Sequence, residues 1–216
     1  MRSFLSEPLE FENVREFLEA EHDRFNNKSF IDEDPISIPH RYTDKEDIEI
    51  SGFITATIAW GQRPVILRNA VRFMEWMDDR PAAFVRNASE DELSKLSQFV
   101  HRTFNGVDAI YFVKALRMIY KNNGGLEGVF MDALKMYPER MDAVIGSVRN
   151  VFFDGMNPGR TGKHFADPLS GSSAKRLNMF LRWMVRSDRR GVDFGWWKQF
   201  PAAADRKSTR LNSSHT

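Results

Sequence analysis

The chain has 216 residues, with 31 Lys and Arg against 30 Asp and Glu, 42% hydrophobic residues and no cysteine. This composition excludes a disordered or collagen-like chain, and the lack of cysteine excludes disulfides and thiolate metal sites. No apolar run is long enough to cross a bilayer and no secretory signal is present, so we expect a cytoplasmic protein without a membrane partner.

The apolar pattern predicts an all-α fold, organised as a single helical domain over residues 1–204. We expect helices over residues 11–25, 46–61, 64–77, 81–87, 90–99, 109–120, 141–152 and 174–186. Asp44 and Ser89 are placed to cap the second and fifth of these, and Gly124-Gly125 is a stop signal. No segment alternates with period two for long enough to predict a strand.

The segment ADPLSGSSAKRLNMFLRWMVR, residues 166–186, concentrates positive charge in an otherwise neutral chain. Pro168 predicts a turn, and Ser172 or Ser173 can cap the following helix. Free N–H groups at the helix start, beside a basic stripe, can hold a phosphate. The nucleic-acid-binding candidates here are Gly171, Ser172, Ser173, Arg176, Arg182 and Arg186. The same spacing is also common on the solvated basic face of an amphipathic helix.

Lys175 is the candidate catalytic residue. In the first turn of a helix, the positive end of the dipole disfavours the charged ammonium and favours the neutral amine. A neutral amine beside an apolar pocket can form a Schiff base, which is the chemistry of a bifunctional DNA glycosylase acting on an extruded nucleotide. The alternative is an ordinary exposed lysine after a helix cap.

The remaining polar residues predict no metal site and no cofactor. The five histidines show no metal-ligand spacing, and the glycine-rich stretches are too irregular for a nucleotide-phosphate loop.

The last twelve residues, DRKSTRLNSSHT at 205–216, differ abruptly in composition from the apolar stretch before them. They resemble the translation of a common sequencing adapter, so we expect them not to be native, the alternative being an ordinary disordered C-terminus. Without them the formal net charge changes from +1 to −1, and any nucleic-acid partner must be met by a local patch.

Four blocks carry a resemblance to a known family: DPISIPHRYTDKEDIEISGFITATIAWGQRPVILRNAVRFM, HRTFNGVDAIYFVKALRMIY, DPLSGSSAKRLNMFLRWMVR and VDFGWW. In this order they resemble an uncharacterised bacterial family, domain of unknown function 2400, from about residue 11 to residue 200. That family in turn resembles, more distantly, the helix-hairpin-helix DNA glycosylases. The resemblance implies that Lys175 is the nucleophile and that Gln62 enters the DNA stack.

Two departures from the glycosylase pattern matter. The hairpin has only Gly171 where two glycines are usual, which puts phosphate binding by its amides in doubt. The assisting aspartate is expected just after residue 200, where the tail follows, and Asp193 is a poor substitute for it. The resemblance therefore implies a C-terminally truncated domain, inactive or badly impaired.

The predicted function is a DNA base-excision glycosylase or lyase acting on damaged bases, with oxidised purines as one candidate class. Phe180 and Trp183 are candidate walls for a flipped base, although core packing explains both aromatic residues as well. The first alternative is a non-catalytic nucleic-acid-binding module, and the second is an all-α protein-interaction domain.

Overall fold

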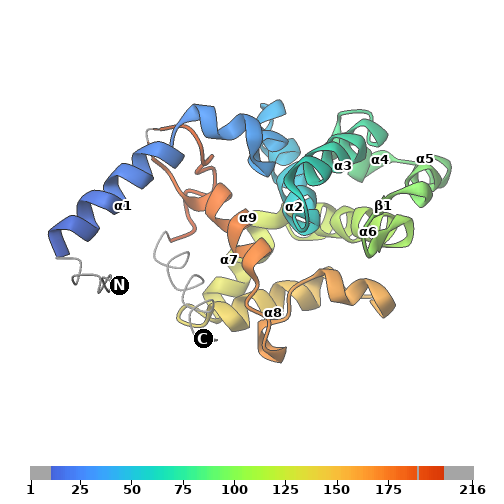
Figure 1. The fold of residues 1–216 in the computed structure, drawn as a ribbon. Coiled ribbons are helices and arrows are strands. Elements are labelled where there is room, and N and C mark those ends of the chain that lie inside the picture. Colours follow the sequence, from blue (N-terminus) through green and yellow to red (C-terminus); the bar gives the residue numbers. More distant parts are fainter. Residues whose placement is uncertain (1–10, 189, 202–216) are drawn as a thin grey trace, which may run out of the picture.

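The computed structural model describes residues 11–188 and 190–201, so the predicted tail at 205–216 lies outside the described residues. The described chain is mainly α-helical, which confirms the predicted class (Figure 1). Its α-helices are α1 Phe11–Phe25, α2 Lys45–Ile58, α3 Arg63–Trp76, α4 Pro81–Asn87, α5 Glu90–Lys95, α6 Gly106–Asn122, α7 Gly125–Met136, α8 Met141–Phe152 and α9 Lys175–Val185. Within the same ranges, no helix has the length and apolar content needed to span a bilayer.

Shorter elements connect these helices. The 3-10 helices are η1 Lys28–Glu33, η2 Pro35–Ser37, η3 Pro39–Arg41, η4 Leu96–Gln98, η5 Gly159–His164 and η6 Pro168–Ser170. Two antiparallel strands, β1 Val100–His101 and β2 Phe104–Asn105, form a minimal hairpin in which His101 pairs with Phe104. Because each strand has two residues, no period-two pattern could reveal them.

Helix α2 lies at the centre of the molecule. All its residues from Ile48 to Ile58 are buried, and α3, α4 and α9 pack around it. On its buried face, the ring of Phe53 lies within 6.0 Å, centroid to centroid, of the rings of Phe112, Phe152, Phe165 and Phe180. Because α2 has so little solvent contact after its first turn, its polar residues Glu49, Ser51, Thr55 and Thr57 are buried together with its apolar ones.

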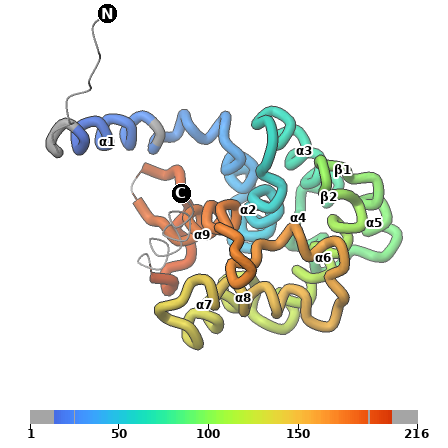
Figure 2. Tube along the Cα trace, turned by 60° about the horizontal axis from the view of Figure 1, so that its bottom comes forward, coloured from blue at the N-terminus to red at the C-terminus, as the bar shows by residue number. Residues whose placement is uncertain are grey.

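Helix α1 lies apart from this core. Figures 1 and 2 show it extending away from the other helices, and its apolar residues Phe17 and Leu18 are 62% and 59% exposed. The predicted helix is therefore confirmed, but its apolar face contributes little to the core.

Helix α7 was not predicted, although its apolar residues have helical spacing. It begins at Gly125, directly after Gly124, which has φ +69°. Two adjacent glycines normally mark the end of a helix, as they do here for α6, and α7 has no side-chain cap to mark its start. The predicted cap at Ser89 is confirmed as a reciprocal capping box with Glu92, whereas Asp44 precedes α2 without a side-chain capping bond.

A buried carboxylate connects α2 to two distant parts of the chain. Glu49 on α2 accepts a hydrogen bond from Tyr120 Oη at 2.7 Å and one from Trp197 Nε1 at 2.8 Å. Lys45 Nζ lies 3.7 Å from the same carboxylate. Burial raises the pKa of Glu49, and these three partners oppose the rise.

The variant Phe53→Ala tests the role of the aromatic cluster. Because Phe53 is 1% exposed, removing its ring leaves a cavity, and we expect the unfolding free energy to fall by about 3–5 kcal/mol. Denaturant unfolding measures this loss. The exposed Val107→Ala should change stability by less than about 0.5 kcal/mol, and equal losses in the two variants would contradict the placement of Phe53.

The variant Glu49→Gln tests the buried carboxylate. Native Glu49 binds its proton more tightly than the unfolded chain does, so wild-type stability should fall relative to the variant as pH rises above 4.5. Denaturant unfolding of both proteins between about pH 4 and pH 7 measures this difference. Exposed Glu75→Gln is the control. If the wild type instead became more stable relative to Glu49→Gln as pH rises, the pKa of Glu49 would be lowered and not raised.

Candidate functional site

A cavity of about 640 Å³ lies between α2, α8, η5 and the start of α9. Its buried wall is apolar and includes Phe53, Ala56, Phe165, Leu177 and Phe180. Its polar wall includes Arg149, Lys163, His164, Ser172, Ser173, Lys175 and Arg176. Pockets of about 300–1,000 Å³ with an apolar lining and a few convergent polar groups are typical ligand sites. Four of the predicted site residues therefore border one cavity: Ser172, Ser173, Lys175 and Arg176.

The start of α9 differs from the prediction that Ser172 or Ser173 caps it. The residue before the helix is Ala174, which adopts a left-handed conformation with φ +51° and has no side chain that can accept a hydrogen bond. Ser172 Oγ instead accepts a bond from the Ala174 amide at 3.2 Å, outside the helix. The left-handed residue turns the chain so that neither serine reaches the first turn, which is left without a side-chain cap. The predicted turn before it is confirmed, because the Gly171 amide donates to the Pro168 carbonyl at 3.0 Å.

Lys175 is exposed in the first turn of α9 and borders the cavity. Among the described residues, no carboxylate lies within 4.0 Å of its amine, and the same is true of Lys163 on η5. Both amines are therefore available to a bound molecule.

Arg176 joins the start of α9 to the end of α2. Its Nη1 donates to the Thr57 carbonyl at 2.6 Å, and its guanidinium lies 4.5 Å from the centroid of the Trp60 ring. Burial lowers the pKa of Arg176. This residue, predicted to bind nucleic acid, also fixes the geometry of the cavity wall.

Gln62 lies on the turn between α2 and α3, two residues after Trp60. It is exposed, and its side chain makes no capping bond to α3. The guanidinium of Arg102, from the β1–β2 turn, packs against neighbouring Gly61: a methyl group added there would lie 3.1 Å from Arg102 Nη1. Arg102 itself has φ +55°, a strained conformation for a non-glycine residue.

His101 attaches the strand hairpin to this turn. Its Nε2 lies 3.1 Å from the Trp60 carbonyl and its Nδ1 lies 2.9 Å from Asn69 Nδ2. A neutral imidazole that donates from Nε2 and accepts at Nδ1 satisfies both contacts. Burial lowers the pKa of His101, and the charges of Arg102 and Arg176 lower it further.

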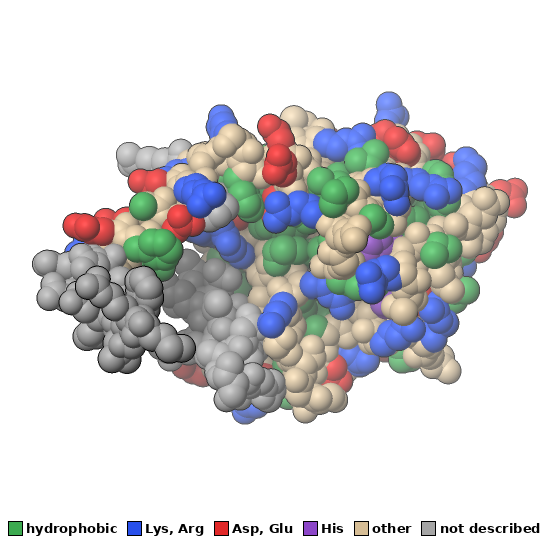
Figure 3. Space-filling view, viewed as in Figure 1, with side chains coloured by type: hydrophobic (Ala, Val, Ile, Leu, Met, Phe, Trp, Pro, Cys, Tyr) green, Lys and Arg blue, Asp and Glu red, His purple; other side chains and the backbone are tan. Residues whose placement is uncertain are grey.

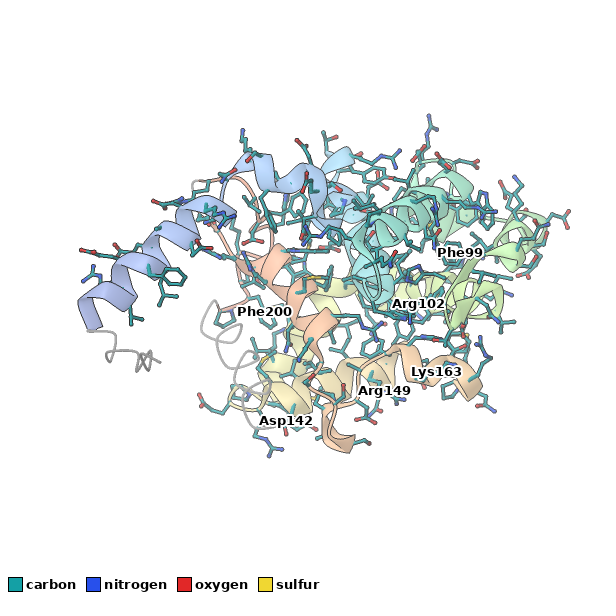
Figure 4. The ribbon with its side chains drawn as sticks, in the orientation of Figure 1. Phe99, Arg102, Asp142, Arg149, Lys163 and Phe200 are labelled. Carbon is teal, nitrogen blue, oxygen red and sulfur yellow. The ribbon has the colours of Figure 1, made fainter. Side chains whose placement is uncertain are left out.

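Positive charge gathers on this face of the molecule. Figure 3 shows Lys and Arg side chains around the histidines, and Figure 4 shows Arg102, Lys163 and Arg149 on the same face. Arg149 is the least available of the three, because its Nε lies 4.0 Å from the Asp167 carboxylate. These cations form a local patch of positive charge on a chain whose formal net charge is close to zero.

Arg182 and Arg186 lie farther along α9 and are not part of the cavity wall. Their Nε atoms lie 3.3 and 3.7 Å from the buried carboxylate of Asp193, and Arg186 Nη2 also lies 3.4 Å from Asp188. Burial raises the pKa of Asp193, and the two arginines oppose the rise. These residues, predicted to contact phosphate, hold the chain after α9 against that helix.

Phe180 and Trp183, the candidate walls for a flipped base, are both buried at 0% and 4% exposure. Only Phe180 borders the cavity; Trp183 packs into the core.

His164, on the cavity wall, lies against a buried carboxylate, and neither residue of this pair was predicted from the sequence. Asp108 on α6 is fully buried and accepts hydrogen bonds from Thr161 Oγ1 at 2.8 Å and from Arg160 Nη1. His164 Nε2 lies 3.2 Å from the same carboxylate. Because His164 and Asp108 are 56 positions apart, no local motif could have revealed the pair. In residues 11–188 and 190–201, no cluster of three or more potential ligands could hold a metal ion.

Residues 34–204 match a family described as a protein of unknown function (DUF2400). The chain belongs to this family. The match includes every residue of the cavity wall and confirms the family predicted from the sequence blocks. No curated protein and no solved structure matches the chain.

Two alanine variants distinguish an arginine that stabilises the fold from a lysine that is free to bind a ligand. Arg182→Ala leaves the buried Asp193 with a weaker partner, so we expect a stability loss of about 1–2 kcal/mol. Lys175→Ala removes an exposed side chain without an ion pair and should cost less than about 0.5 kcal/mol. Denaturant unfolding measures the loss of unfolding free energy in both variants. Similar losses would contradict the assignment of Arg182 to the fold and of Lys175 to the free cations.

Proposed function

We propose that this protein binds damaged DNA on the cavity face and acts as a base-excision glycosylase or lyase through Lys175. The observation that carries the proposal is an exposed lysine without an ion pair, in the first turn of α9, on the wall of a cavity of about 640 Å³ with an apolar interior. Enzymes that act on a base take it out of the stack into such a pocket, where apolar side chains replace its stacking partners.

The chemistry assigned to Lys175 needs only a neutral amine and a sugar aldehyde. The amine adds to C1′ of a ring-opened deoxyribose, and the oxygen leaves as water, which gives an imine.

The cations around the cavity suit a phosphate backbone. Lys163 borders the cavity without an ion pair, and Arg102 lies beside the turn that carries Gln62. Contacts of this kind position DNA without reading its sequence, and they make affinity depend on salt. The number of such cations on one face supports DNA over an uncharged small molecule.

The resemblance to helix-hairpin-helix glycosylases adds support from two positions. Lys175 matches the nucleophile, and Gln62 matches the residue that enters the DNA stack. The bond from Arg176 to Thr57 brings the start of α9 to the end of α2, five residues before Gln62. This contact joins the segment that carries Lys175 to the helix that precedes Gln62.

A non-catalytic DNA-binding module remains the second candidate, and the unpaired cations Arg102 and Lys163 favour it equally. It requires the same face but no adduct at Lys175. A single experiment separates the two functions.

Borohydride trapping on duplex DNA with a preformed abasic site tests the proposal. The abasic sugar already contains the aldehyde, so the experiment asks only whether Lys175 adds to it and does not require the base removal that is expected to be impaired without the assisting aspartate. We expect a covalent protein–DNA adduct with the wild type and at least a 100-fold lower yield with Lys175→Ala, detected by gel electrophoresis.

Lys163→Ala is the matched control, since it removes an exposed lysine from the same cavity wall. It should weaken DNA binding but still form an adduct at saturating DNA. Salt-dependent binding with no adduct would favour the non-catalytic module, and no binding at all would contradict both candidates.

A further inference from the structure

His164, on the wall of the cavity that Lys175 borders, forms a buried pair with Asp108, which does not itself line the cavity. His164 is 5% exposed, borders the cavity and has Nε2 at 3.2 Å from Asp108 Oδ2. The ring is held on its faces and edges by aromatic neighbours, with the Trp60 ring stacked at 5.9 Å and the Phe104 ring edge-on at 5.0 Å. The imidazole is therefore fixed in position before any ligand binds.

Asp108 is fixed even more firmly than the histidine. Its carboxylate accepts bonds from the Asn105 amide at 2.9 Å, from Thr161 Oγ1 at 2.8 Å and from Arg160, and His164 Nε2 faces it at 3.2 Å without a hydrogen bond. A fully buried carboxylate with three hydrogen-bond donors keeps a constant orientation. A carboxylate 3.2 Å from His164 Nε2 can stabilise an imidazolium that forms during a reaction.

We propose that His164, which faces the Asp108 carboxylate, is the general base that cleaves the DNA strand after Lys175 has formed its Schiff base. This inference rests on the proposed function of Lys175. It assigns the second chemical step to a different residue on the same cavity wall.

The step balances without any further reactant. His164 removes a proton from C2′ of the imine-linked sugar, and the electron pair of that C–H bond forms the C2′–C3′ double bond. The C3′–O bond breaks, and the 3′ phosphate leaves with its electrons. The proton rests on His164, whose positive charge faces the Asp108 carboxylate.

Burial and the neighbouring charges together determine the pKa of His164. Burial lowers the pKa of His164, while Asp108 on α6 raises it. Lys163 and Arg160 on η5 and Arg176 on α9 lower it further. The net direction is downward, so the imidazole is neutral at pH 7 and can accept a proton.

The test measures adduct formation and strand cleavage separately, on the same preformed abasic duplex under single-turnover conditions. For His164→Gln, we expect a trapped adduct within about twofold of the wild type and strand cleavage slowed about 100-fold or more. Asp108→Asn should slow cleavage less, because the base is retained. His40→Gln is the matched control, as His40 bonds the Val192 carbonyl and is not part of the cavity wall.

A second measurement uses the wild type alone and does not depend on how the variants fold. The rate of cleavage per adduct should rise with pH, with a midpoint below the ordinary histidine value of 6.5. A rate of cleavage per adduct that stays constant between about pH 5 and pH 8 would overturn the role of His164.

The outcomes also separate this inference from the one on which it rests. Normal adducts in His164→Gln with cleavage within threefold of the wild type would refute the general base and leave Lys175 in place. No adduct in the wild type would refute both.

Discussion

The close packing of α9 on α2 determines where the cavity forms. A methyl group at Gly52 of α2 would lie at ordinary contact distance from α9, 3.5 Å from Met184 Cε and 3.6 Å from Phe180, so α9 packs directly against α2 at this glycine. At the other end of the contact, Arg176 bonds the Thr57 carbonyl and covers Trp60. Apolar packing and one charged hydrogen bond thus place the start of α9, and Lys175 with it, against the central helix.

The sequence predicted most of the helices because their signals are local. Apolar spacing located α2, α3, α6 and α8, and Ser89 marked the start of α5 through its capping box. The same local signals failed at α7, whose start resembles a stop, and at Ala174, whose left-handed conformation no side-chain pattern records. Helix ends that depend on backbone conformation alone are the least visible in a sequence.

The residues of the candidate site were also only partly predictable from the sequence. Lys175 and Arg176 were predicted from their position after a turn, and both border the cavity. The pairing of Arg182 and Arg186 with Asp193, and of His164 with Asp108, depends on how distant segments fold together. Charge type and helical spacing identify which cations share a helix, but only the tertiary structure identifies which of them already have a partner.

The ion pairs of Asp193 have a consequence for any polyanion that approaches this face. When DNA binds to a free lysine, it loses the mobile cations condensed on its phosphates, and their release into solution drives association. Arg182 and Arg186 already carry a fixed anion of the protein itself, and a phosphate would have to compete with that anion. In the proposed complex with DNA, the entropy of ion release would therefore come from the free lysines at the rim of the cavity and not from Arg182 and Arg186.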